Sequence, residues 1–189
     1  MGNRLTLVSH GPTAATRVAA FPVDEPLSDP GPVSAAGLGR VAVALRGPET
    51  RCAQTATALG LAASVDDRLR DLDFGAWRGR TLDDVAAAEP AAVTRWLTDP
   101  AAAPHGGESL ADLVARVGGW LDERPADPAP VVAVTHPSVV RAALVHALGA
   151  DPAAYWRIDV VPLSRTVLRG GPGRWALRWL SPAGQQRDE

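Results

Sequence analysis

The sequence of 189 residues contains no lysine and only one cysteine, Cys52. A single cysteine excludes an intramolecular disulfide and the usual cysteine-based zinc arrangements. The formal net charge of −2 argues against a nucleic-acid partner held by a basic face. The sequence also lacks the charged, apolar and small-residue progression of a signal peptide, and no apolar run approaches the roughly 20 residues needed to span a bilayer. These absences predict a cytoplasmic protein that binds neither nucleic acid nor a membrane.

The residues that are present suit one packed domain. Apolar residues make up 46% of the chain and charged residues 21%, which provides ample material for a core and no signature of disorder. At this length we expect a single domain over residues 1–189, with an ordered core from about residue 4 to residue 180. Residues 181–189 are predicted to form a tail that is frayed over Gln185–Glu189.

Hydrophobic periodicity predicts the elements of this domain. Short apolar runs bounded by turn residues predict strands at Arg4–Val8, Val41–Leu45, Val131–Thr135, Ile158–Val161, Arg165–Leu168 and Trp175–Trp179. Apolar residues at helical spacing, together with capping signals, predict helices at Arg51–Leu59, Leu82–Leu97, Ser109–Glu123 and Ser138–Leu148. Gly170-Gly-Pro-Gly173 favours a hairpin between the last two strands. Strands interleaved with helices indicate an α/β fold, a three-layer α/β/α domain with a mostly parallel central sheet.

Two segments allow more than one interpretation. Ser34–Leu45 is an alternative helix to the strand at Val41–Leu45, although two glycines weaken this option. Phe21–Pro32 contains four prolines and several acidic residues, which indicates an ordered surface loop or a lid.

Two of the predicted strands end directly before a histidine. His10 follows the run Leu5–Ser9, and His136 follows the run Val131–Thr135. Because the carboxyl ends of parallel strands meet at one edge of a sheet, these imidazoles are expected to lie at the same rim. The rim is therefore a candidate active site.

Further residues near predicted element boundaries suit phosphoryl transfer, which needs a neutral nucleophile, cationic donors and an acid. Gly11 after His10 allows a sharp turn and a close approach of phosphate. Arg51 at a helix start can bind phosphate oxygens in bidentate fashion. Glu108 lies in the loop His105-Gly-Gly-Glu-Ser109, from which a carboxyl can project into a cleft. Each of these residues alone is more often structural, but their combination indicates a site.

The same segments resemble the histidine phosphatase superfamily, in the branch that also holds the cofactor-dependent phosphoglycerate mutases. The family patterns are Arg-His-Gly-x-Thr, Ser-x-x-x-Arg-x-x-x-Thr-Ala, Leu-x-Glu-x-x-Phe-Gly-x-Trp-x-Gly, Gly-Glu-Ser and Val-x-His-Gly. They are matched in that order by Ser9-His-Gly-Pro-Thr13, Gly47-Pro-Glu-Thr-Arg-Cys-Ala-Gln-Thr-Ala56, Leu69-Arg-Asp-Leu-Asp-Phe-Gly-Ala-Trp-Arg-Gly79, Gly107-Glu-Ser109 and Val134-Thr-His-Pro137. The resemblance runs from about residue 4 to residue 180.

The resemblance implies a role for each matched residue. His10 would accept the phosphoryl group, Arg51 and His136 would hold it, and Glu108 would protonate the leaving alcohol. The predicted substrate-binding residues are Ser9, Gly11, Thr16, Arg51 and His136. The partner would be a small phosphorylated substrate, with no cofactor and no metal.

The chain departs from the family pattern at the residue before the nucleophile. Ser9 replaces an arginine that contacts the transferring phosphate, and the loss of one preorganised donor typically costs on the order of 10²–10³ in rate. Arg17 and Arg80 are candidates for a replacement cation, and Pro137 removes the backbone N–H that follows the second histidine. We therefore expect a metal-independent phosphatase of reduced or altered activity. A catalytically impaired relative that binds an anion or a partner protein is the alternative, and a phosphoglycerate mutase-type phosphotransferase is a third possibility that lacks a second cation cluster near Glu108.

Overall fold

The computed structural model of the protein describes residues 3–29, 31–124, 129–171 and 173–181. Its centre is a six-stranded sheet with the strand order β3-β2-β4-β1-β5-β6. The strands are β1 (Asn3–Ser9), β2 (Val43–Arg46), β3 (Ser64–Val65), β4 (Val131–Thr135), β5 (Arg165–Gly170) and β6 (Ala176–Ser181). The first four strands pair in parallel, and β5 and β6 complete one side of the sheet as antiparallel strands.

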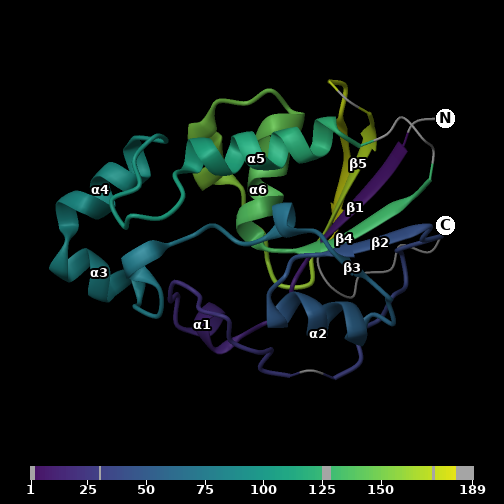
Figure 1. The fold of residues 1–189 in the computed structure, drawn as a ribbon, viewed down its shortest axis with the longest axis horizontal. Coiled ribbons are helices and arrows are strands. Elements are labelled where there is room, and N and C mark those ends of the chain that lie inside the picture. Colours follow the sequence, from purple (N-terminus) through teal and green to yellow (C-terminus); the bar gives the residue numbers. More distant parts are fainter. Residues whose placement is uncertain (1–2, 30, 125–128, 172, 182–189) are drawn as a thin grey trace.

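Helices cover both faces of this sheet (Figure 1). α2 (Thr50–Ala58) lies on one face, and α5 (Leu110–Asp122) and α6 (Pro137–Ala147) lie on the other. α1 (Ala14–Arg17) follows β1, and α3 (Leu82–Ala88) and α4 (Pro90–Thr98) lie together beyond one end of the sheet. This arrangement confirms the predicted three-layer α/β/α fold with a mostly parallel sheet.

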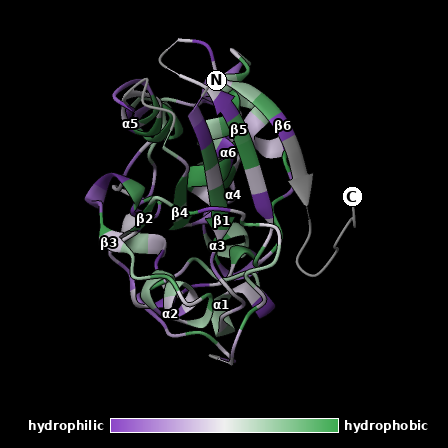
Figure 2. Ribbon diagram, turned by 90° about the vertical axis from the view of Figure 1, so that its right-hand side faces the viewer, coloured by the Kyte–Doolittle hydropathy of each residue, from purple (hydrophilic) through white to green (hydrophobic). Residues whose placement is uncertain are grey.

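Successive side chains of the central strands point alternately into the hydrophobic cores on the two faces of the sheet. Leu5 and Leu7 of β1 belong to the large core cluster on the side of α5 and α6, whereas Val8 packs on the side of α2. Successive strand residues point to opposite faces, so a strand covered on both sides has to be apolar throughout. β4, with the sequence Val-Val-Ala-Val-Thr, is buried along its whole length and is almost uniformly hydrophobic (Figure 2).

Both central strands end at the same level of the sheet. Ser9 at the end of β1 is paired with Thr135 at the end of β4. His136 is the N-cap of α6, and Pro137 is the first residue of that helix. A proline suits this position because the first N–H groups of a helix have no partner within it. Pro137, which differs from the family pattern, therefore occupies a regular position at the start of a helix.

Two predicted elements are wrong. The single helix expected over Leu82–Leu97 is two helices, because α3 ends before Glu89 and Pro90 begins α4. The strand expected at Ile158–Val161 does not form, since the structure describes these residues as irregular chain, with Val160 buried in the large core cluster. Here tertiary packing accounts for the apolar residues that had indicated a strand.

Three further predictions concern the edges of the sheet and the loops. The strand at Val41–Leu45 is confirmed as β2, shifted to Val43–Arg46, so the alternative helix over Ser34–Leu45 is wrong. The predicted hairpin is confirmed, because β5 and β6 pair in antiparallel fashion. The described part of Phe21–Pro32 is a loop, which is bound to α2 as set out below. The expected frayed tail, Gln185–Glu189, lies outside the described residues.

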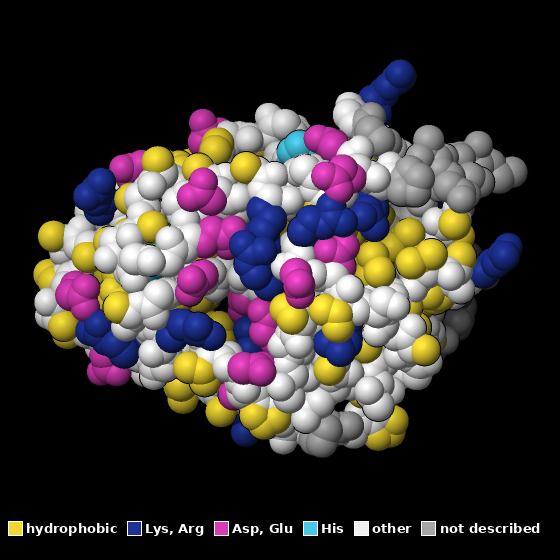
Figure 3. All heavy atoms as spheres, in the orientation of Figure 1, with side chains coloured by type: hydrophobic (Ala, Val, Ile, Leu, Met, Phe, Trp, Pro, Cys, Tyr) yellow, Lys and Arg dark blue, Asp and Glu magenta, His cyan; other side chains and the backbone are white. Residues whose placement is uncertain are grey.

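The exterior shows mixed charge. On the face drawn in Figure 3, arginines and acidic side chains are interspersed, with hydrophobic side chains scattered between them. Within the described ranges, every helix is too short or too polar to cross a bilayer.

Candidate active site

The pairing of β1 with β4 brings the two predicted histidines together. His10 lies one residue beyond the end of β1, and its backbone N–H donates to the carbonyl oxygen of Thr135 at 2.8 Å. The rings of His10 and His136 have their centroids 5.2 Å apart and are inclined at 64°. The strand ladder thus places both imidazoles at one rim, as the sequence predicted.

His10 is held as a neutral imidazole. Its Nδ1 lies 2.7 Å from the carbonyl oxygen of Gly11, and a carbonyl only accepts, so Nδ1 carries the proton and Nε2 keeps its lone pair. Burial and, next, the positive charge of His136 lower the pKa of His10 to about 4. Near neutral pH the ring therefore presents an unprotonated Nε2, the form that a nucleophile requires.

His136 is held in the opposite charge state. The ring is fully buried, its Nε2 lies 2.8 Å from Oε2 of Glu49, and its Nδ1 lies 3.3 Å from Oδ2 of Asp71. Burial opposes the charged form, but the carboxylate of Asp71 outweighs it and raises the pKa of His136 well above its ordinary value. Both ring N–H groups of the imidazolium can then donate to carboxylates.

Arg51 brings a buried guanidinium to the same rim. It is the second residue of α2 and is 1% exposed, with Nη2 donating to Oδ2 of Asp71 at 2.7 Å and Nη1 to the carbonyl oxygen of Val23 at 2.6 Å. Its Nε lies 3.3 Å from Nδ1 of His136, which it cannot donate to while that nitrogen carries a proton. Burial disfavours the cation, yet Asp71 and then Glu25 raise the pKa of Arg51. A cation held in this way can bind phosphoryl oxygens.

The loop within Phe21–Pro32 binds the start of α2. Asp24 accepts hydrogen bonds from the N–H of Thr50 at 2.7 Å and from its hydroxyl at 3.0 Å. The N–H of Leu27 donates to Oε1 of Gln54 at 2.7 Å, which ties the loop to α2 again. The predicted ordered loop is therefore packed over the start of α2, where the carboxylate of Asp24 binds the helix N-terminus.

Asp71 is a candidate functional residue that reasoning from the sequence did not single out. Its carboxylate accepts hydrogen bonds from Arg51, His136 and the hydroxyl of Ser138. Burial favours the neutral form, but His136 and Arg51 together hold the pKa of Asp71 far below its usual range. The signal that finds it is the segment beginning at Leu69, where Asp71 stands in place of the glutamate in the family pattern.

Glu108, the predicted proton donor, is bound elsewhere in this structure. Its Oε1 and Oε2 accept from Nε and Nη2 of Arg116 on α5, both at 2.7 Å, and Nη2 of Arg70 lies 3.6 Å from Oε1. Both oxygens of Glu108 are thus occupied by a bidentate arginine. The acid role of Glu108 stays a prediction that this pairing does not favour.

A pocket of about 240 Å³ opens beside Arg51. It is lined by Pro22, Val23, Glu49, Arg51, Arg70, Asp71, Leu72, Asp73 and Arg78. Neither Arg17 nor Arg80, the candidates for a replacement cation, lines this pocket. Arg17 is exposed on α1, and Arg80 forms an ion pair with Glu89. The other arginines that line the pocket are Arg70 and Arg78, which stand at variable positions of the Leu69–Gly79 motif and were not singled out from the sequence.

The remaining predicted substrate contacts are engaged or enclosed. Ser9 is fully buried, and no residue in the described part of the chain forms a hydrogen bond with its hydroxyl. The N–H of Gly11 donates to the hydroxyl of Thr55 at 3.0 Å. The hydroxyl of Thr16 is part of a capping box with Thr13 at the start of α1. A contact of Ser9, Gly11 or Thr16 with substrate thus requires rearrangement.

One group of side chains could hold a metal ion. Ligand atoms of Glu49, Cys52 and His136 lie within 4.8 Å of one another beneath the rim. Gly47, which stands where the family pattern has serine, is close to this group, because a Cβ at that position would lie 2.8 Å from the carbonyl oxygen of Leu69 and 3.1 Å from Nε2 of His136. The close packing around His136 thus accounts for the glycine.

Known proteins resemble this chain in sequence and in fold. The sequence model of the histidine phosphatase superfamily (branch 1) matches residues 5–181. Glucosyl-3-phosphoglycerate phosphatase of Mycolicibacterium vanbaalenii is 34% identical over 208 aligned residues, covering 93% of this chain and 91% of that protein. The structure of mycobacterial glucosyl-3-phosphoglycerate phosphatase Rv2419c in complex with VO3 has a TM-score of 0.77 and 26% identity, over 94% of this chain and 98% of that chain.

A further relative is considerably longer than this chain. The bifunctional protein Rv2228c of Mycobacterium tuberculosis is 35% identical over 134 residues, which cover 67% of this chain. The match covers 37% of Rv2228c itself.

Proposed function

The chain belongs to the histidine phosphatase superfamily (branch 1), and we propose that it is a metal-independent phosphatase acting on a small phosphorylated metabolite. The observation that carries the proposal is the pair of adjacent histidines in opposite charge states, His10 neutral and His136 protonated, with Arg51 beside them. A neutral nucleophile next to fixed cations is the arrangement that transfer of an anionic phosphoryl group requires.

In the proposed first step, Nε2 of His10 attacks phosphorus and forms a phosphohistidine. The bond between phosphorus and the leaving oxygen breaks, its electron pair stays on that oxygen, and an acid supplies the proton. Arg51 and His136 exchange their contacts with Asp71 for contacts with the phosphoryl oxygens and stabilise the charge that develops there. In the second step a water attacks phosphorus, the bond between phosphorus and Nε2 breaks, and the carboxylate left by the acid takes up the proton of the water, which releases inorganic phosphate and restores the neutral ring.

We infer that Asp71 supplies the proton, ahead of Glu108. Asp71 accepts directly from Arg51 and His136, the two cations beside the nucleophile, whereas both carboxylate oxygens of Glu108 are bound by Arg116. When a phosphate dianion takes over the two cations, Asp71 loses the charges that keep it ionised and gains a negative neighbour. Both changes favour its protonated form, which can donate to the leaving oxygen.

The pocket lining favours a substrate that carries a second anionic group. Arg70 and Arg78 lie in the lining beside Arg51, together with the acidic Glu49, Asp71 and Asp73. The guanidinium of Arg78 forms no hydrogen bond or ion pair with the described residues and is therefore available to a ligand. A carboxylate or a further phosphate attached near the reacting phosphoryl group could pair with them. Relatives of this chain include a glucosyl-3-phosphoglycerate phosphatase and a phosphoserine phosphatase from Hydrogenobacter thermophilus, whose named substrates combine phosphate with carboxylate.

The test is hydrolysis of a panel of phosphoesters, with and without carboxylates, in the presence of a chelator. We expect turnover by the wild-type chain, and a loss of at least ~10⁴-fold in His10→Ala because the nucleophile is removed. His146→Ala is the matched control, since that histidine pairs with Asp122 at the surface and should leave the rate unchanged. Equal rates for the wild type and His10→Ala would refute the proposal.

A second candidate, a catalytically impaired anion-binding protein, is favoured by Ser9, whose side chain offers no cation to the transferring phosphate. It predicts binding of inorganic phosphate by calorimetry, weakened by Arg51→Ala, without turnover of any phosphoester above the His10→Ala background. Turnover above that background would exclude it.

A further inference from the structure

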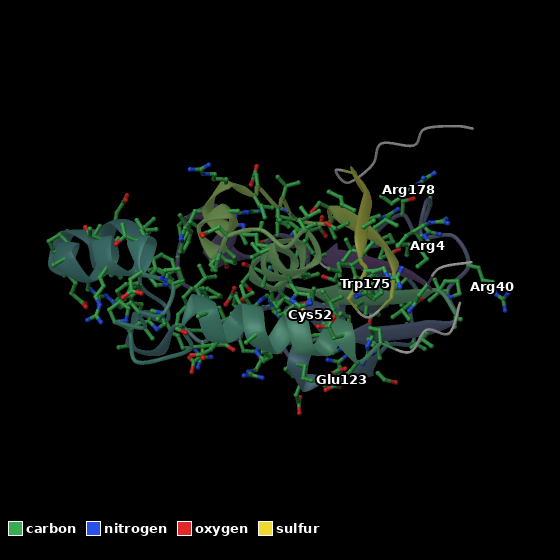
Figure 4. All side chains as sticks on the ribbon, turned by 90° about the horizontal axis from the view of Figure 1, so that it is seen from above. Arg4, Arg40, Cys52, Glu123, Trp175 and Arg178 are labelled. Atoms are coloured by element: carbon green, nitrogen blue, oxygen red, sulfur yellow. The ribbon has the colours of Figure 1, made fainter. Side chains whose placement is uncertain are left out.

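Three potential metal ligands converge where α2 meets the end of β4. Glu49 is the N-cap residue of α2, and Cys52 lies three positions further on, in the first turn of the helix. His136 reaches both residues from the end of β4, with Nε2 at 2.8 Å from Oε2 of Glu49 and 3.3 Å from Sγ of Cys52. Cys52 is fully buried and lies inside the molecule, whereas Glu123 and Arg40 extend from its outline (Figure 4).

We propose that Glu49, Cys52 and His136 form a binding site for Zn²⁺, or for a similar borderline-soft divalent cation. Thiolate, imidazole and carboxylate are the ligands that zinc takes in proteins, and three protein ligands with one open position form a common zinc arrangement. Glu49 also lines the pocket, which gives the ion a path from solvent.

The surroundings of His136 support this assignment independently of the three ligand atoms. Nδ1 of His136 faces Oδ2 of Asp71 at 3.3 Å, so the ring nitrogen opposite Nε2 is held by a carboxylate. A metal-binding histidine commonly donates its other N–H to a carboxylate, which orients the ring and makes the ligating nitrogen more basic. Asp71 would act here as a positioning residue.

Filling of the site is coupled to the release of protons. Zinc binds cysteine as the thiolate and histidine as the neutral imidazole, so the ion enters as protons leave. This release offsets part of the charge that the ion brings into a buried site.

Occupation of this site would block phosphoryl transfer, a consequence that rests on the proposed function. Zn²⁺ on Nε2 removes the imidazolium form of His136, which is needed to hold the phosphoryl group. The chain would then be a phosphatase that works without a metal and is inhibited by zinc.

The experiment uses the full chain, stripped of metal by dialysis against a chelator and titrated with Co²⁺. We expect a thiolate-to-cobalt charge-transfer band that saturates at about one equivalent and disappears when Zn²⁺ displaces Co²⁺. Cys52→Ala should abolish the band and weaken Zn²⁺ binding at least ~10-fold, and Glu49→Gln should weaken binding but keep the band. Glu49→Gln keeps the test decisive if Cys52→Ala fails to fold.

His146→Ala is the control for adventitious binding, because its pair with Asp122 is the other histidine–carboxylate contact in the described residues. It should bind like the wild type. Absence of the band in the wild type, or equal Zn²⁺ affinity in Cys52→Ala, would overturn the site. An inactive wild type that still shows the band would support the site and count against the proposed function alone. Reversible inhibition by Zn²⁺, lost in Cys52→Ala, would support both.

Discussion

The ends of β1 and β4 carry the same residue type in different electrostatic surroundings. His10 faces the carbonyl oxygen of Gly11 and has no carboxylate partner among the described residues, so burial keeps it neutral. His136 is buried more completely, yet the carboxylate of Asp71 raises its pKa and keeps it protonated. Burial alone therefore does not decide the charge of a histidine, because a buried carboxylate within hydrogen-bond distance can outweigh it.

The two charge states depend on each other. The rings are 5.2 Å apart, and the positive charge of His136 is one of the causes that lower the pKa of His10. Protonated His136 thus serves two purposes in the proposed reaction: it holds the phosphoryl group and it keeps the nucleophile unprotonated. The dependence can be tested by changing His136, or the residues around the two rings, and measuring the effect on activity and on His10.

Among variants that keep the nucleophile, the largest expected effect follows from removing the protonated partner, His136. His136→Gln keeps a hydrogen-bonding side chain but no charge, and we expect kcat/KM to fall by about 10²–10³ because a preorganised donor to the developing charge is lost. Steady-state kinetics on the best substrate of the panel would measure this fall. A change below about threefold would mean that His136 does not contact the transferring group.

A smaller effect is expected when the proposed proton donor, Asp71, is replaced. Comparison with Glu108→Gln shows which of the two carboxyl groups is the acid. Asp71→Asn should lower kcat by on the order of 10² for alkyl phosphates and by much less for aryl phosphates, because a good leaving group needs little protonation. Glu108→Gln is the matched variant and should change both rates by less than about tenfold. The reverse ranking would restore Glu108 as the proton donor.

The charge states themselves can be read by titration. His10, with a pKa of about 4, should stay neutral at pH 5, where an unperturbed histidine would be about 97% protonated. If neutral His10 is required, the hydrolysis rate at pH 5 should be about 30-fold higher than it would be with a nucleophilic histidine of ordinary pKa. NMR titration of the ring protons measures this directly, and in His136→Gln the pKa of His10 should rise, because a positive neighbour is gone. An unchanged His10 titration in that variant would contradict the coupling.

How much of this site could be predicted from the sequence depended on whether the signal was local. The ends of β1 and β4 were predictable because apolar runs stop at turn residues directly before the two histidines. The break at Pro90 was also readable locally, since proline begins a helix more readily than it continues one. The irregular chain around Val160 was not, because its burial arises from packing between distant elements.

The contacts between side chains in the site could not be predicted from local sequence patterns. The pairing of Glu108 with Arg116 joins a loop to the next helix and carries no motif of its own. Arg78 reaches the pocket only through the fold. The grouping of Glu49 with Cys52 was readable in part from their closeness in the sequence, but their contact with His136 required the tertiary structure.

The smallest expected effect concerns two serines that flank the histidines, Ser9 before His10 and Ser138 after His136. The hydroxyl of Ser138 donates to Asp71, whereas that of Ser9 is buried with no partner among the described residues. A buried hydroxyl without a partner costs about 1 kcal/mol or more, and a satisfied one contributes a similar amount. Ser9→Ala should therefore raise the free energy of unfolding by up to about 1 kcal/mol, and Ser138→Ala should lower it by about as much, as measured by urea denaturation. If Ser9→Ala is instead destabilised, the hydroxyl has a partner in solution. A loss of phosphate affinity in the same variant would identify that partner as the ligand, and Ser9 would then bind phosphate in place of the family's arginine.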